Sequence, residues 1–195
     1  MKRPAGLSLP LRILNAALVA SALCSHAVAG ELFERFEALK SQGEQYRPIG
    51  NPGDPAKILA IGLERTRAFI SNTPAYEVLL ERDGAIAYRG TGGIDRLGEF
   101  RGSIRDAAEF QKLAEFICAG DFFELPFNPG ANYSDAPSSV FVVRTVDGEK
   151  WVLDPNEPRE MSPSTQVILE RVDEMLAQSN LTEEKVIRLT SSFSE

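Results

Sequence analysis

Histidine and cysteine are almost absent from this chain of 195 residues, which holds one His and two Cys. Both His26 and Cys24 fall within residues 1–29, so the rest of the chain keeps a single Cys, Cys118, and no His. Ser-His-Asp and Cys-His catalysis need a histidine base, and zinc and copper sites need clustered His or Cys ligands. A single Cys also excludes an intrachain disulfide. We therefore expect no metal site and no cofactor, and we assign no catalytic residue.

Basic residues are also in short supply. The chain has 21 Lys and Arg against 28 Asp and Glu, which gives a formal net charge of −7. Nucleic-acid binding needs a basic face that neutralises phosphates, and docking on anionic lipid needs a basic patch. The charge balance therefore argues against nucleic acid and anionic membrane surfaces as partners.

The first 29 residues have the pattern of a secretory signal peptide. Three basic residues precede a mostly apolar run over residues 13–24, and Ala27-Val28-Ala29 forms a small-residue cleavage site before Gly30. The apolar run is shorter than the ~20 residues that span a bilayer. We expect cleavage here, no membrane span afterwards, and a periplasmic or extracellular protein. Cleavage would leave 166 residues with a net charge of −10, because three basic and no acidic residues would be removed.

The sequence after the signal peptide divides into four segments. Residues 30–43 predict a short amphipathic helix, because apolar residues recur at helical spacing. Those residues are Leu32, Phe33, Phe36 and Leu39. Residues 44–56 are rich in Pro and Gly and predict a linker. An α+β domain is expected over residues 57–178, followed by a polar tail over residues 179–195.

Two hairpins and two long helices are predicted within the domain. Asp83-Gly84 and Asp147-Gly148 each separate two extended apolar runs, which is a strong signal of a β-hairpin. Ser103 to Asp106 has the form of a capping box before one helix, and Ser162-Pro163 supplies the N-cap and first residue of another. Strands that occur in hairpins, and do not alternate with helices, indicate an α+β fold. We expect an antiparallel sheet of hairpins with two to three helices packed on one face.

Several polar groups could form sites, and each has a simpler interpretation. Gly90-Thr91-Gly92-Gly93 could cradle a phosphate, but neither a P-loop lysine nor a helix start follows at the required spacing, which favours a turn between strands. Cys118 lies on the apolar stripe of a predicted helix, which favours a buried thiol over a nucleophile. One loop is crowded with oxygen ligands but lacks the order of a calcium-binding loop, which favours a solvated turn. Its residues are Asp154, Asn156, Glu157 and Glu160.

Carboxylates are the main candidates for catalytic groups in this chain. Glu77, Glu81 and Asp83 alternate with apolar residues, which predicts the solvent face of a half-buried strand. A glycan hydrolase would instead need two carboxyl groups about 5–9.5 Å apart across a cleft, one of them with a raised pKa. The acids whose positions decide between these interpretations are Glu77, Glu99, Asp135 and Asp154.

Aromatic residues gather in the second half of the chain and give the best pointer to a binding surface. Phe122, Phe123, Phe127, Tyr133 and Trp151 are close in sequence or flank a predicted hairpin. Half of them are expected to close the core below the helix that follows Ser103. The others would form an apolar strip for a ligand or partner, because exposed aromatic patches mark interaction sites.

A series of short motifs also runs through the middle of the chain. In order, they are Thr73-Pro74-Ala75-Tyr76, Asp83-Gly84, Tyr88-Arg89-Gly90, Asp121-Phe122-Phe123-Glu124-Leu125 and Asp135-Ala136-Pro137. This series resembles a domain-of-unknown-function family of exported bacterial proteins, over about residues 58–176. The family pattern opens with Cys-x-Gly-x-Cys-Pro-x-Tyr before a hairpin. Here Phe69 and Thr73 stand at the Cys positions and Ser71 at the Gly, so any thiol or disulfide role is lost. The resemblance implies an envelope or secreted protein and no particular activity.

Two functions remain open from the sequence. The first is an exported, non-catalytic domain that binds an envelope protein or a small ligand. The alternative is a carboxylate-based hydrolase that acts on an envelope glycan or a similar polymer. A convergence of two acids in a cleft would favour the hydrolase, and a surface without such a pair would favour the binding domain.

Overall fold

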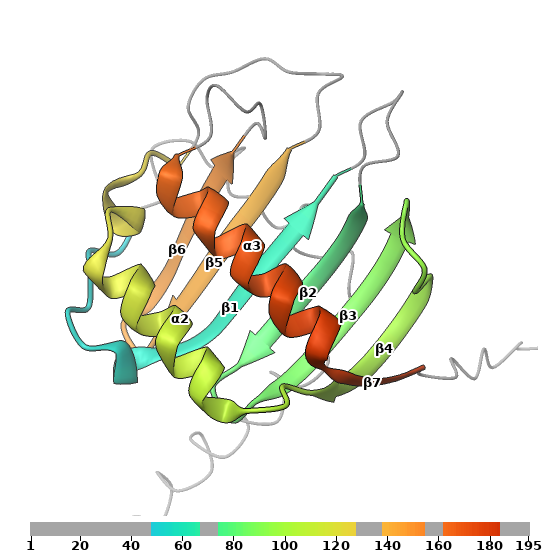
Figure 1. The fold of residues 1–195 in the computed structure, drawn as a ribbon. Coiled ribbons are helices and arrows are strands. Elements are labelled where there is room, and N and C mark those ends of the chain that lie inside the picture. The colour runs from blue at the N-terminus through green and yellow to red at the C-terminus, as the bar shows by residue number, and fades with distance from the viewer. Residues whose placement is uncertain (1–47, 67–73, 128–137, 155–161, 184–195) are drawn as a thin grey trace, which may run out of the picture.

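The computed structural model describes residues 48–66, 74–127, 138–154 and 162–183. These residues form a seven-stranded antiparallel sheet and two α-helices, so the structure confirms the α+β class (Figure 1). The strands are β1 (Ile58–Arg65), β2 (Ala75–Glu81), β3 (Ala85–Gly92), β4 (Gly98–Ser103), β5 (Ser139–Thr145), β6 (Gly148–Asp154) and β7 (Asn180–Glu183). The helices are α2 (Ala107–Ala119) and α3 (Pro163–Gln178), with short 3-10 turns η3 (Pro55–Lys57) and η4 (Phe122–Glu124).

Both predicted hairpins form, at the predicted turns. Gly84 between β2 and β3 has φ +91°, and Gly148 at the start of β6 has φ +144°. Side chains rarely adopt such backbone conformations, which is why glycine occupies both positions. The Asp83 carboxylate also accepts a hydrogen bond from the amide of Ala85 at 3.0 Å. The turn chemistry therefore fixes the register of each pair of strands.

The order of strands across the sheet is β6-β5-β1-β2-β3-β4-β7. The β5–β6 hairpin comes late in the chain, yet β5 pairs with β1, so that Leu63 lies opposite Val78 on one side and Phe141 on the other. Strand β1 is therefore held in the middle of the sheet by segments from both halves of the sequence.

One apolar core lies between the sheet and the two helices. Because side chains alternate along a strand, Ile61, Leu63, Val78 and Phe141 all project to the same side, which we call the front face. They belong to one core cluster with residues of both helices. The buried apolar residues of the helices are Phe110, Leu113, Ala114 and Ile117 of α2, and Ile168, Val172, Met175 and Leu176 of α3. Figure 1 shows both helices in front of the sheet.

The opposite face, which we call the back face, carries a second and smaller apolar cluster. Val140, Val142 and Trp151 are 0%, 3% and 0% exposed. The half-buried Phe127 and Leu153 pack against them. Neither α2 nor α3 contributes a residue to this cluster. The sheet is thus apolar on both sides near β5 and β6.

The start of α2 differs from the predicted capping box. Ser103 ends β4, where it pairs with Ala85 of β3 and with Asn180 of β7. The N-cap is Asp106, whose carboxylate accepts from the amide of Ala108 at 2.9 Å. Ser103 was the wrong choice because a cap needs a residue that is free to leave the strand, and its backbone is held in the sheet from both sides.

The sheet also extends into the segment that was expected to be a polar tail. Residues 180–183 form β7, which pairs with β4 along its outer edge. The close approach of the two strands depends on Gly102, because a Cβ at this position would lie 2.1 Å from the carbonyl oxygen of Asn180. A polar strand at the edge of a sheet carries no apolar alternation, so the sequence pattern did not reveal it.

We predict that Gly102→Ala lowers the free energy of unfolding by about 2 kcal/mol, because the added methyl group meets backbone and forces β7 away from β4. Urea-induced unfolding measures this change. Gly50→Ala is the matched control, since a Cβ there meets nothing within 4 Å. Equal unfolding midpoints for the two variants would contradict the close contact between β4 and β7.

Candidate functional site

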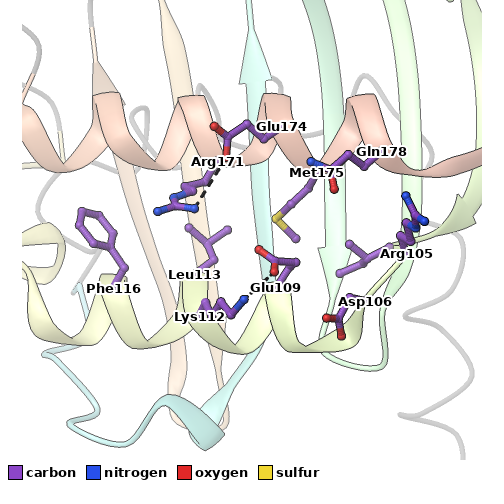
Figure 2. Close-up of a pocket in the computed structure, with 11 residues that line it drawn as sticks. Arg105, Asp106, Glu109, Lys112, Leu113, Phe116, Arg171, Glu174, Met175 and Gln178 are labelled. Carbon is purple, nitrogen blue, oxygen red and sulfur yellow. Dashed lines mark hydrogen bonds and ion pairs between the residues drawn. The ribbon is translucent and has the colours of Figure 1, made fainter.

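A groove of about 550 Å³ runs between α2 and α3. It opens on the side of the helices that faces away from the sheet (Figure 2). The residues that line it are Ile104, Arg105, Asp106, Glu109, Lys112, Leu113, Phe116, Arg171, Glu174, Met175 and Gln178. They come from the start and middle of α2, the second half of α3 and the segment before α2.

The floor of the groove is apolar and rigid. Leu113 and Met175 are 3% and 6% exposed and belong to the front core. In Figure 2 these two side chains point toward each other from facing helices, and Phe116 of α2 also points toward α3. Side chains that are part of a packed core hold one conformation. A ligand would therefore meet a preformed surface.

The rim of the groove is charged, with both signs present. Lys112 and Glu109 form an ion pair of 2.7 Å within α2, and Arg171 and Glu174 form one of 3.7 Å within α3. The hydrogen bond from Lys112 to Glu109 raises the pKa of Lys112, so this ammonium stays charged at neutral pH. Each of these two pairs joins residues three positions apart on one helix, and neither pair crosses the groove.

These rim pairs can exchange partners easily. Ion pairs between exposed side chains contribute only about 0–1 kcal/mol, because water screens them and the long side chains lose freedom when they meet. A ligand that carries its own charges could replace them at little cost. The groove therefore combines a fixed apolar floor with adjustable charges, an arrangement that suits binding of a short peptide segment.

Three of the five aromatic residues predicted as a binding surface are buried. Phe122 and Phe123 are 0% and 6% exposed, with their rings edge to face at 5.7 Å, and they belong to the front core. Trp151 is 0% exposed and lies on the back face. Phe127 is half-buried beside Trp151, and Tyr133 lies outside the described residues. Phe122 and Phe123 therefore help to close the core beside α2, as expected for half of the set, and Trp151 is buried in the separate back-face cluster.

The carboxylates considered for a hydrolase project from both faces of the sheet. Glu77 and Glu99 are on the back face, with Arg89 of β3 between them in the same row across the strands. Asp154 lies in the same row across the strands as Ser139 and Tyr76. Tyr76 is next to Glu77 in β2 and therefore projects to the front face, so Asp154 projects to the front as well. Asp135 lies outside the described residues.

Glu77 is not on a solvent face, contrary to the sequence interpretation. It is 7% exposed, and its neighbours across the strands are Glu64 and Arg89. Alternation along β2 correctly put Glu77 opposite the front core. It could not show that the back face near the centre of the sheet is also covered.

Asp154 serves the start of α3. Its carboxylate accepts hydrogen bonds from the amide of Ser162 at 3.3 Å and from the hydroxyl of Thr165. The Ser162 hydroxyl accepts from the amide of Ser164 at 3.3 Å, as the predicted N-cap requires. A carboxylate at the positive end of a helix dipole stabilises that helix. The role of Asp154 in the described structure is therefore to anchor α3. In the parts of the chain that are described, no three His, Cys, Asp or Glu residues come together to hold a metal ion.

A second polar cluster joins the middle of α3 to the sheet, and the sequence did not reveal it. The Tyr76 hydroxyl donates to Asp173, and Arg65 donates to the same carboxylate at 3.2 Å. The guanidinium of Arg65 also lies 5.8 Å from the centre of the Tyr76 ring, and the centre of the Tyr88 ring lies 5.7 Å from that of Tyr76, with the two rings tilted by 31°. These residues come from β1, β2, β3 and α3, so only the folded chain brings them together.

This cluster is poorly suited to acid-base chemistry at neutral pH. Burial, followed by the negative charge of Asp173, raises the pKa of Tyr76 far above its usual value of 10. Burial raises the pKa of Tyr88 to about 12. A phenol with such a pKa is a poor base and a poor nucleophile. The cluster instead fixes α3, and with it one wall of the groove.

Lys150 is another polar residue whose side chain is buried on the front side of the sheet. It is 2% exposed, and its ammonium donates to the carbonyl oxygen of Leu125 at 2.5 Å. Burial lowers the pKa of this amine. The contact holds the segment after η4 against β6, and the lack of exposure keeps reagents away from the nitrogen.

Comparisons with protein-family models, curated proteins and solved structures found no match for this chain. Within the four described ranges, no helix has both the length and the apolar character that crossing a membrane requires.

We predict that the folded protein loses stability as the pH rises above 10. The pKa values of Tyr76 and Tyr88 are higher in the folded chain than the usual 10 of an unfolded one, so folding favours their neutral forms. Their contribution is complete below pH 10 and declines above it. Tyrosinate absorbance measures the titration: Tyr88→Phe should remove a step at about pH 12. A step near pH 10 for Tyr88 in the folded chain would contradict its burial.

Proposed function

We propose that this protein is a small exported domain that does not catalyse a reaction and that binds an envelope protein in the groove between α2 and α3. The groove carries the binding part of the proposal, because it offers a fixed apolar floor inside a rim of mixed, weakly paired charges. The signal-peptide pattern of residues 1–29 supports export to the periplasm or the cell exterior.

The dimensions of the groove favour a short peptide segment as the occupant. Its wall on α2 runs from Asp106 to Phe116, ten residues along a helix, or about 15 Å. Four or five residues of an extended peptide span the same distance. An apolar side chain over Leu113 and Met175, with charged residues on either side, would match both the floor and the rim.

The alternative, a carboxylate hydrolase, has less support. It requires two carboxyl groups across a cleft. Glu77 and Asp154 project from opposite faces of the sheet, and the acids of the groove, Asp106, Glu109 and Glu174, are exposed or half-buried on one helical surface.

We predict that a photocrosslinking residue at Gln178, in the groove, captures an envelope protein, and that one at Val146 does not. Val146 is the matched control, since it is 59% exposed and lies in the turn between β5 and β6. Arg105→Glu with Arg171→Glu should lower the yield from Gln178 at least tenfold, whereas Lys57→Glu, outside the groove, should leave it unchanged. Equal capture from Gln178 and Val146 would contradict the proposal. An unchanged yield from Gln178 after the two charge reversals would also contradict it.

We also predict that the chain, expressed with its first 29 residues in a bacterium, is recovered from the periplasm or medium with Gly30 at its N-terminus. Mass spectrometry of the purified protein measures this directly. Ala29→Arg, which removes the small residue at the cleavage site, should block processing. Recovery of the unprocessed chain from the cytoplasm would refute export and would return His26 and Cys24 to the mature protein.

A further inference from the structure

The back face of the sheet is buried more deeply than the described residues around it explain. Trp151 and Val142 are 0% and 3% exposed, and Ala60 and Glu77 are 3% and 7% exposed. Both helices lie on the front. Among the described apolar residues outside the sheet, Phe127 alone packs against the back-face cluster. A single phenylalanine is too small to cover four strands, so another part of the chain must lie here.

The burial of back-face residues differs from strand to strand, and this difference indicates which strands are covered. The buried positions lie on β6, β5, β1 and β2. On β3 and β4, the back-face residues Ala87, Arg89 and Arg101 are only half-buried, and Thr182 on β7 is exposed. Four adjacent strands span about 14 Å. The cover therefore has about that length and lies toward the β6 edge.

The described chain begins at the same edge of the sheet. Ile49 packs against the front core beside the turn between β5 and β6, and a Cβ at Gly148 would lie 2.9 Å from its side chain. The chain before it must therefore pass around the β6 edge to reach the back face. Trp151 is three residues further along β6, or about 10 Å away. The six residues that follow Gln42, up to Pro48, can span at most about 20 Å. Residues that precede Gly43 can therefore reach the back of β6 and β5.

The sequence of that preceding segment matches the cover in length and pattern. Residues 31–42 would form a helix of about 18 Å, slightly longer than the four strands are wide. Its apolar stripe, formed by Leu32, Phe33, Phe36 and Leu39, needs a partner surface, since such a short helix is not stable alone. The back face supplies one, with small residues Ala60 and Gly62 next to Val142 and Trp151.

We propose that residues 31–42 pack as an amphipathic helix across the back of β6, β5, β1 and β2. The helix would put its phenylalanines over Val142 and Trp151 and would complete a layer on the second side of the sheet. The partner groove between α2 and α3 would then be left as the open surface.

The fluorescence of Trp151 tests this proposal, because it is the single Trp of the chain. Phe33→Asp with Phe36→Asp should shift the emission to longer wavelength and raise quenching by acrylamide several-fold. Glu34→Gln with Arg35→Gln, which leaves the apolar stripe intact, should change neither. Circular dichroism and a cooperative unfolding transition verify that both variants are folded.

Unchanged emission and quenching in the folded Phe33→Asp/Phe36→Asp variant would overturn the proposal. Exposure of Trp151 by Tyr133→Asp alone would also overturn it, because residues 128–137 would then be the cover.

If the double variant does not fold, a crosslink replaces the fluorescence measurement. In a Cys118→Ser background, a short bis-maleimide should join Phe33→Cys to Leu79→Cys on the back of β2, and should not join Glu34→Cys to Leu79→Cys. The reverse preference, or no crosslink with either pair, would refute the docking.

Discussion

The packing of β1 between β5 and β2 is the constraint on which the rest of the structure depends. This strand joins the β5–β6 hairpin to the β2–β3 hairpin, so the sheet is continuous only when segments more than 70 residues apart have paired. Residues of β1 such as Ile61 and Leu63 are 1% and 0% exposed and lie beneath the helices on the front. Each such buried side chain contributes about 1.5–3 kcal/mol relative to an exposed one. The two helices have a common surface to pack on because β1 has brought the hairpins together.

The helices are held on this surface in different ways. Helix α3 is fixed by polar contacts at its start, middle and end: by Asp154, by Asp173 to Tyr76 and Arg65, and by Arg96, which donates to the carbonyl oxygen of Leu176 at 3.3 Å. Helix α2 relies more on its apolar face, with Asn51 donating to the carbonyl oxygen of Cys118 at 2.7 Å near its end. Hydrogen bonds to buried charged groups hold a side chain in one geometry. The α3 wall of the groove is therefore fixed in position, and the apolar core fixes the floor.

Local features of this fold could be read from the sequence, and global ones could not. Turns and helix caps depend on a few neighbouring residues, so a short stretch of sequence is enough to predict them. Examples are the turns at Gly84 and Gly148 and the N-cap at Ser162. The order of strands depends on pairings between distant segments, which no periodicity encodes. The candidate groove was missed for the same reason: Lys112 and Glu109 look like any exposed pair on a helix until α3 is placed beside them. Glu77 shows the limit of sequence patterns most clearly. The alternation of residues along β2 predicted which face of the sheet Glu77 projects from, but it did not predict that this face is buried.

The groove and the back face make opposite physical demands on what covers them. The charges around the groove are exposed and already paired within each helix, so an occupant exchanges weak interactions for others and can leave again. On the back face, exposing Trp151, Val142 and Val140 to water would cost several kcal/mol, a large share of the ~5–15 kcal/mol that stabilises a typical domain. A cover that leaves at such a cost is part of the fold and not a ligand. The back face therefore calls for a segment of the same chain, always present at high effective concentration, whereas the groove suits a separate molecule that binds reversibly.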